Sequence, residues 1–209
     1  PGVGGHGMGD TSRGRIYRLA PKGQQGYKTP PFDLESDAGL TLAFLSPALS
    51  VRSLATLKLI EQGDGALPLL EKLAASTDPL RRARALWLLG RLEKGRSHIL
   101  ASLQAQEARF RILAIRSLKQ NASADFLRLV RPLLNDSDPQ VRRELLVQLR
   151  DVTGPEALDA IVGLAGKYDG HDRWYLEAIA IASRGREGAV FQALAKSWQA
   201  ALTPAANGI

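Results

Sequence analysis

Apolar residues recur at intervals of three and four along most of the chain, as in Leu54, Leu57 and Ile60. This spacing places side chains on one face of an α-helix. Turn-forming residues interrupt the pattern repeatedly, for example at 63–65, 135–139 and 170–172. From about Ser36 onward, the pattern therefore predicts short α-helices that are joined in pairs by tight turns.

A repeat of about 30 residues organises these pairs. Five segments align when they start at Val51, Arg81, Phe110, Val141 and Trp174, which are 30, 29, 31 and 33 residues apart. A second apolar helix is expected in each unit, at 66–75, 96–103, 125–134, 156–165 and 189–198. One hairpin cannot bury its apolar face alone, so neighbouring hairpins must stack. We therefore predict a solenoid rather than a bundle around one centre.

The first helices share residue types at equivalent positions, and each type has a physical explanation. Asp-Pro precedes two of them, at 78–79 and 138–139, where Asp caps free N–H groups and Pro needs no donor. A small residue stands at 55, 85, 114 and 178, which lets neighbouring helices approach closely, whereas the fourth unit has Leu145. We expect the arginines near the turns to bond carboxylates or turn carbonyls of an adjacent repeat: Arg52, Arg82, Arg111 and Arg142. Tyr175 replaces the arginine in the fifth unit, which is typical of a terminal cap.

These Asp-Pro-x-Val-Arg-like helix starts resemble HEAT repeats of the short bacterial type, over residues 39–200. The resemblance implies an all-α, right-handed α-solenoid of about five helix hairpins with a concave and a convex side. We place the solenoid at 39–204 and a tail at 205–209. HEAT arrays are mostly scaffolds and interaction surfaces, so the resemblance implies a non-catalytic chain.

The first 38 residues have a different character, being rich in Gly and Pro. Residues 14–20 have the composition of one strand, which a single chain segment cannot pair by itself. Two interpretations remain open: an orphan strand that belongs to a sheet elsewhere, or an extended arm that lies over the helices.

The string 14–23, GRIYRLAPKG, resembles the closing strand of a glucose/sorbosone dehydrogenase-type β-propeller. Residues 36–47 resemble the junction between such a propeller and HEAT repeats in large membrane-bound dehydrogenases of planctomycetes and verrucomicrobia. Those proteins continue into a cytochrome c domain with a CxxCH haem site. This chain holds neither the rest of the propeller nor a CxxCH motif, so the resemblance implies an excised fragment of such a protein. It also implies a periplasmic or cell-envelope location.

The absence of cysteine excludes disulfides, thiolate-bound metals and attached c-type haem within the chain. No apolar run approaches the 18 or so residues that a membrane-spanning helix needs. His6, Met8 and Asp10 alternate with glycines and are weak candidates for metal ligands, although a loop is the simpler interpretation. A cluster of Asp169, His171 and Asp172 is better explained by Asp172 capping a helix beside an exposed His171. We expect no cofactor in this chain.

Positive charge is concentrated in the middle of the chain. The 209 residues carry 28 Lys and Arg against 21 Asp and Glu, and residues 81–150 hold most of the excess. Most of these arginines belong to first helices, which line the convex side of HEAT arrays. The concave side would receive the few cations of the second helices, and these are our candidate binding residues: Lys72, Arg96, Arg128 and Arg131.

The aromatic residues are few and are expected mainly in the core. Trp87, Phe110 and Phe126 fall at core-like helical spacing, which argues against base-stacking platforms. The cluster of Trp174, Tyr175 and Trp198 near the C-terminal end either closes the core, which we favour, or docks the next domain.

The leading hypothesis is a scaffold that holds a sugar-dehydrogenase-like propeller beside a downstream partner, for which the resemblance implies a cytochrome c-like domain. The main alternative is a basic nucleic-acid-binding module of the alkylpurine DNA glycosylase kind, which the placement of charge argues against. Two others are a fragment of a quinone- or metal-dependent oxidoreductase and a bilin-lyase-like HEAT protein, for which no residue of the chain offers a site.

Overall fold

The computed structural model describes residues 19, 22–23 and 32–202, with side chains as far as 197. By its internal contacts the chain divides into two units, Pro1–Phe32 and Asp33–Ile209, and the helices all belong to the second. The predicted strand at 14–20 lies outside the described residues except for Leu19, as do His6, Met8, Asp10 and the tail at 205–209.

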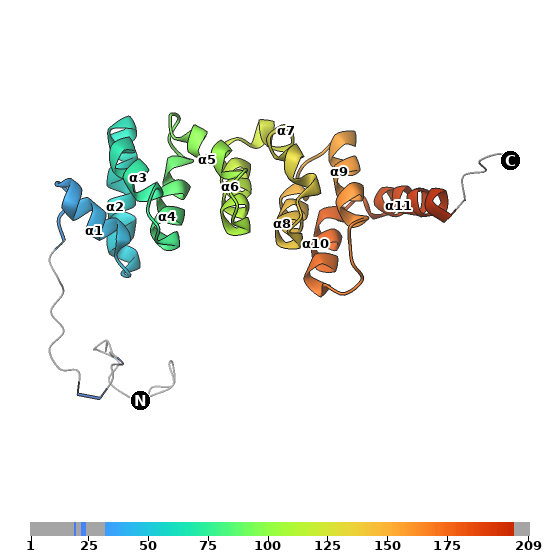
Figure 1. Cartoon of the computed structure of the whole chain (residues 1–209), viewed down its shortest axis with the longest axis horizontal. Helices are drawn as coiled ribbons and strands as arrows, with labels where there is room; N and C mark the ends of the chain where they lie inside the picture. Colours follow the sequence, from blue (N-terminus) through green and yellow to red (C-terminus); the bar gives the residue numbers. More distant parts are fainter. Residues whose placement is uncertain (1–18, 20–21, 24–31, 203–209) are drawn as a thin grey trace, which may run out of the picture. The chain divides into compact units, whose positions relative to one another are not determined.

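Every regular element of the described residues is a helix (Figure 1). The α-helices are α1 (Asp37–Leu45), α2 (Leu49–Gln62), α3 (Leu67–Ala74), α4 (Pro79–Leu89), α5 (Arg96–Ser102), α6 (Ala108–Asn121), α7 (Phe126–Val130), α8 (Pro139–Leu149), α9 (Pro155–Ala165), α10 (Arg173–Ser183) and α11 (Glu187–Leu202). Three short 3₁₀-helices complete them, η1 (Gly63–Ala66), η2 (Ser123–Asp125) and η3 (Arg131–Asn135).

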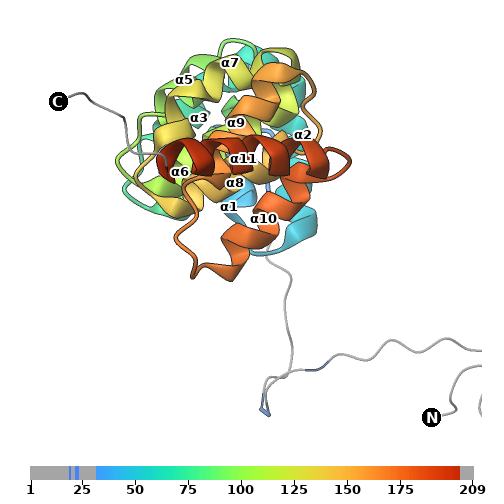
Figure 2. The same ribbon diagram turned by 90° about the vertical axis from the view of Figure 1, so that its right-hand side faces the viewer.

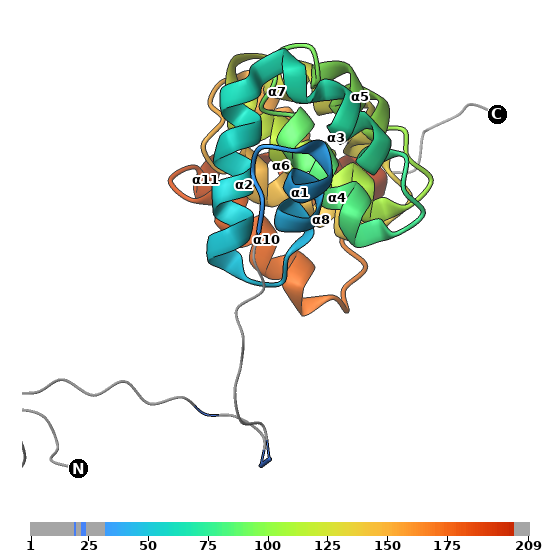
Figure 3. The same cartoon turned by 90° about the vertical axis from the view of Figure 1, so that its left-hand side faces the viewer.

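The helices form an α-solenoid, as the repeat predicts. The first helices α2, α4, α6, α8 and α10 follow one another along the helical unit, and α3, α5, α7 and α9 form a second row beside them (Figure 1). Views along the array show the two rows around a common axis (Figures 2 and 3). Helix α1 precedes the first predicted hairpin and packs on α2, and α11 lies across the opposite end, on α9 and α10.

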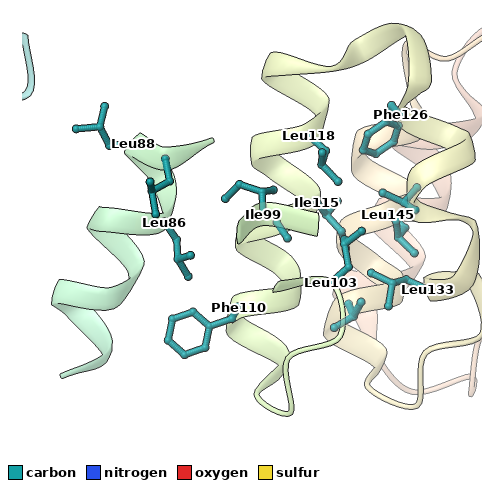
Figure 4. Close-up of a cluster of buried hydrophobic side chains, with 14 of the residues drawn as sticks. Leu86, Leu88, Ile99, Leu103, Phe110, Ile115, Leu118, Phe126, Leu133 and Leu145 are labelled. Carbon is teal, nitrogen blue, oxygen red and sulfur yellow. The ribbon is translucent and has the colours of Figure 1, made fainter. Parts of the chain in front are cut away.

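One apolar core runs along the whole array instead of surrounding one centre. It extends from Leu40 in α1 to Val190 in α11, and consecutive repeats share it. Figure 4 shows its middle part, where Leu86 of α4, Ile115 of α6 and Leu145 of α8 follow one another. Each repeat therefore completes the core of its neighbour, which is why the stack is stable although one hairpin would not be.

The small residues of the repeat lie where the sequence predicts close packing. Ala55, Ala85 and Ala114 are fully buried, and Ala178 nearly so. Leu145, the exception, is also fully buried. All five positions therefore belong to the core, with a small side chain in four units and a larger one in α8.

The helix starts follow the local chemistry of their residues. The Asp78 side chain accepts hydrogen bonds from the N–H groups of Leu80 and Arg81, and that of Asp138 accepts one from Gln140. Pro79 and Pro139 occupy the first helical positions, where no donor is required.

The second helix of the third unit differs from the prediction. A continuous helix was expected at 125–134, but α7 ends at Val130 and η3 begins at Arg131. Pro132 explains the break, because it cannot donate the backbone hydrogen bond that an α-helix needs at that position. The break places Arg128 and Arg131 on two separate short helices.

Candidate binding surfaces and the repeat arginines

The turns before four of the five first helices share a local hydrogen bond. The side chains of Ser46, Ser76, Asp136 and Asp169 each accept a hydrogen bond from the N–H two residues later, at 2.8–3.2 Å. In the third unit Ala105 occupies this position and has no side-chain acceptor. The turn of this unit is held by its arginine, because Arg111 Nη1 donates to the carbonyls of Ala105 and Gln106 at 2.8 Å.

The repeat arginines bind their own turn, the next turn, or both. Arg52 and Arg142 donate to carbonyls of the turns that precede their helices, at Ser46 and at Asp136 and Ser137. Arg111 also crosses to the next repeat, where Nε and Nη2 each lie 2.8 Å from a carboxylate oxygen of Asp136. This pair raises the pKa of the Arg111 guanidinium above its ordinary value, mainly through the hydrogen bonds that Arg111 donates to Asp136.

The ion pair of Arg82, between the second and third units, is longer than that of Arg111. Its Nη1 lies 3.8 Å from the Glu107 carboxylate, and its guanidinium carbon lies 4.1 Å from the centre of the Phe110 ring. Tyr175, which replaces the arginine in the last unit, is buried and donates its hydroxyl to the Leu164 carbonyl at 2.9 Å. Burial raises the pKa of this hydroxyl.

Most of the other first-helix arginines have acidic partners. Arg116 of α6 bonds to Glu144 of α8 at 2.6 Å, and Arg143 of α8 approaches Asp172, before α10, at 3.5 Å. Four further arginines pair within their own helix or turn: Arg81, Arg109, Arg150 and Arg173. Since these cations are neutralised internally, the basic block at 81–150 presents less free charge than its composition suggests.

The second-helix cations are brought together only in part. Arg96 and Arg128 both lie near the Asp125 carboxylate, at 3.6 and 3.1 Å. Arg128 and Arg131 line a cavity of about 500 Å³ between α7–η3 and α9, hereafter the α7–α9 cavity. Lys72 is exposed in the last turn of α3, two repeats away from this cavity.

The α7–α9 cavity also has residues that the sequence did not single out. Lys167 adds a third cation, and Glu156 and Asp159 add two carboxylates. Among the described residues, neither Arg131 nor Lys167 forms an ion pair. The cavity can therefore accept both acidic and basic groups of a partner. Glu156 begins the second helix that was predicted at 156–165, and Lys167 follows its end by two residues, so the sequence placed both near this helix.

Two tryptophans that were predicted to lie in the core are exposed. Phe110 and Phe126 are buried as predicted, but Trp87 is 38% exposed. Trp174 is 68% exposed beside a buried Tyr175, so the favoured core interpretation holds for Tyr175 and is wrong for Trp174. The side chain of Trp198 lies outside the described residues. The surface of the first helices is thus more apolar than the sequence suggested.

Each exposed tryptophan lines a hollow between first helices. Trp87 lies in a groove of about 590 Å³ between α2 and α4, with Leu57, Arg52, Arg84 and Arg91 among its lining residues. We call it the Trp87 groove. Trp174 lines a hollow of about 830 Å³ along α6, α8 and α10, where arginine and glutamate side chains are mixed.

The candidate polar clusters are engaged in structural bonds. Asp169 accepts N–H bonds from His171 and Asp172, and Asp172 caps α10 by accepting from Trp174 and Tyr175. His98 of α5 lies 3.0 Å from Glu71 of α3. Within residues 32–197, no three His, Asp or Glu side chains converge as a metal site would require. No described helix is long and apolar enough to cross a membrane.

Comparison with known proteins agrees with the architecture. The family model for HEAT repeats matches residues 96–182, from the start of α5 into α10. No curated protein and no solved structure matches the chain. Together with the stacked hairpins, the family match shows that residues 96–182 form a HEAT-repeat region.

Proposed function

We propose that this chain is a non-catalytic scaffold that fixes the distance between two partner domains. The observation that carries the proposal is the series of side-chain bonds across repeat boundaries. Arg111 reaches Asp136, Arg116 reaches Glu144, and Arg143 approaches Asp172. These bonds tie the third hairpin to the fourth and the fourth to the fifth, and we expect such links between neighbouring repeats to limit bending of the array.

The partner surface is proposed on the second-helix side, at the α7–α9 cavity. Arg128, Arg131 and Lys167 supply donors there, and Glu156 and Asp159 supply acceptors. A surface with both charges favours a protein partner, because a polyanion such as DNA would be repelled by the two carboxylates.

We further propose that the chain connects a sugar-dehydrogenase-like propeller to an electron-accepting domain. The support for this step is the resemblance of residues 14–23 and 36–47 to the end of such a propeller and its junction with HEAT repeats. The reading frame on both sides of the chain tests it. Propeller blades upstream and a haem-binding motif downstream are expected, and an upstream frame without blades would overturn this connection.

Rigidity can be measured directly because the chain has no cysteine. Cysteines introduced at Glu61 in α2 and Ala180 in α10, both exposed, would carry two spin labels. Pulsed electron paramagnetic resonance should give one narrow distance distribution, which should broaden in Arg111→Ala and not in the matched Arg109→Ala. A broad distribution in the parent chain would contradict a spacer.

A further inference from the structure

The arginines of the Trp87 groove differ from most other arginines of the first-helix row. Arg52, Arg84 and Arg91 line the groove together, and no carboxylate lines it. Within the described part of the chain, none of the three forms an ion pair. Most of the rest of the first-helix row shows the opposite arrangement. Arg142 also bonds only to turn carbonyls, but eight arginines pair with carboxylates: Arg81, Arg82, Arg109, Arg111, Arg116, Arg143, Arg150 and Arg173.

Two of the groove arginines are held in place without being neutralised. Arg52 Nη1 donates to the Ser46 carbonyl at 3.0 Å, and Arg84 Nη1 donates to the Leu45 carbonyl at 2.9 Å. A carbonyl fixes a guanidinium but carries no net charge, and each guanidinium keeps further donors for a ligand. Burial, and then repulsion from Arg52, lower the pKa of Arg84, while attraction to Asp78 acts in the opposite direction.

The remaining wall of the groove is apolar. Phe44 and Leu88 form buried surface, whereas Leu57 and Trp87 are open to solvent. A volume of about 590 Å³ lies within the range of roughly 300–1,000 Å³ that is typical of ligand sites. Tryptophan and arginine are also the residues most often found at the energetic centre of protein interfaces.

We propose that the Trp87 groove binds an acidic peptide segment of a partner protein, which places one large apolar side chain against Trp87 and Leu57 and carboxylates on Arg52, Arg84 and Arg91. Charge complementarity selects this occupant. A carboxylate accepts two parallel hydrogen bonds from one guanidinium and relieves the repulsion between Arg52 and Arg84. The apolar wall requires a side chain that free phosphate and the phosphates of nucleic acid do not carry.

This surface lies on the first-helix row, whereas the α7–α9 cavity lies on the second-helix row. The inference is therefore independent of the proposed spacer function, which the distance measurement tests by itself. A chain with a broad distance distribution could still bind the peptide, and a rigid chain could fail to do so.

Selection from a displayed library of random short peptides, at low salt, tests the proposal. The complete chain serves as bait, and peptides that also bind Arg91→Glu are removed. We expect the selected peptides to combine Asp or Glu with Leu, Phe or Trp. The enrichment of basic or uncharged peptides, or no enrichment, would overturn the proposal.

Variants then locate the binding of a selected, fluorescently labelled peptide. Trp87→Ala and Arg91→Glu should each weaken its affinity about tenfold or more, as for residues at the centre of an interface. The matched controls are Trp174→Ala and Arg173→Glu, which make the same changes on α10 and should leave the affinity unchanged. Equal losses in the controls would show non-specific attraction and overturn the proposal.

Further measurements distinguish an acidic peptide from other ligands of the Trp87 groove. Replacing the peptide carboxylates by amides, or its apolar residue by Ser, should abolish binding, and higher salt should weaken it. Duplex DNA or vesicles of anionic lipid that compete as well as the peptide would make the groove a general anion site. A dimer that Trp87→Ala converts to a monomer would show that the groove binds a second copy of the chain.

The two groove variants also need a test of folding. Because Arg91 is exposed, Arg91→Glu should keep the helical circular dichroism spectrum even if Trp87→Ala does not.

Discussion

The guanidinium of Arg111 and the carboxylate of Asp136 form a two-bond ion pair across a repeat boundary, with both N–O distances at 2.8 Å. The two side chains are only 13% and 6% exposed. The same guanidinium donates to the carbonyls of Ala105 and Gln106 in the preceding turn. One side chain therefore links the turns of the third and fourth units.

Removing Arg111 should destabilise the array strongly. Arg111→Ala leaves the buried Asp136 carboxylate without its partner, which costs about 3 kcal/mol in the free energy of unfolding. Urea unfolding followed by circular dichroism measures the change. Arg109→Ala removes an exposed arginine that pairs with Glu107 and should cost no more than about 0.5 kcal/mol. Similar losses in both variants would show that the boundary pair has no special role.

Gly90 permits the close approach of the end of α4 to α6. A Cβ at Gly90 would overlap the hydroxyl of Ser117, which is buried, and would lie 3.1 Å from Cγ1 of Ile99. Gly90→Ala should therefore cost about 1–3 kcal/mol in thermal or urea unfolding. Ser117→Ala in the same chain should recover part of the loss, so the double variant should cost less than the two single changes together.

Gly163→Ala provides the matched control for this change. Gly163 lies in α9, and a Cβ there would meet no atom within 4 Å. Alanine favours the helix over glycine by about 1 kcal/mol, so this variant should be slightly more stable than the parent chain. A loss of stability at Gly163 would contradict the packing explanation for Gly90.

Asp169 should contribute to stability in a pH-dependent way. Its carboxylate accepts N–H bonds from His171 and Asp172, which hold its pKa below the ordinary value of 3.8. The folded chain therefore binds this proton less readily than the unfolded chain. The resulting stability is complete above the unfolded pKa and is lost as the pH falls through the folded pKa.

Asp169→Asn keeps an acceptor oxygen in the turn but removes the charge. The melting temperature of the variant should fall below that of the parent chain at neutral pH, and the difference should shrink below about pH 4. A difference that is constant between neutral pH and pH 3 would mean that the charge of Asp169 does not stabilise the turn.

Duplex DNA should not bind the chain at physiological salt. Most first-helix arginines of the basic block are paired with carboxylates, and Arg96 and Arg128 share Asp125. Few cations therefore remain to release counterions from a phosphate backbone. Fluorescence anisotropy with a labelled duplex at two salt concentrations measures this. A salt-dependent affinity that is lost when Arg128 and Arg131 are both changed to Ala would instead support the nucleic-acid hypothesis.

Local chemistry made the repeat predictable from sequence. Asp138 and Pro139 identify a helix start by capping and by the missing donor, and they follow Asp78 and Pro79 by two periods of the repeat. The replacement of the arginine by Tyr175 identifies the last unit. These features depend on residues that are close in sequence, so no knowledge of the superhelix is needed.

The binding surfaces depended on how one repeat sits on the next, which the period does not determine. Trp87 is adjacent to the buried Leu86 and Leu88, and spacing alone does not tell which side of α4 the next repeat covers. The partner of Arg111 could be expected in a neighbouring turn, but the choice of Asp136 depends on the rotation between units. Arg131 and Lys167 line one cavity although they belong to different repeats.

The side-chain links between repeats are of unequal strength, which matters if the array is pulled from its ends. The boundary between the second and third hairpins has the contacts Arg82–Glu107 at 3.8 Å and Arg96–Asp125 at 3.6 Å. The boundary between the third and fourth hairpins has the two short hydrogen bonds from Arg111 to Asp136 and the bond from Arg116 to Glu144. Links in series carry the same tension, and the weakest yields first. Mechanical stretching would thus part the chain between its second and third hairpins and leave the HEAT repeats beyond that point stacked.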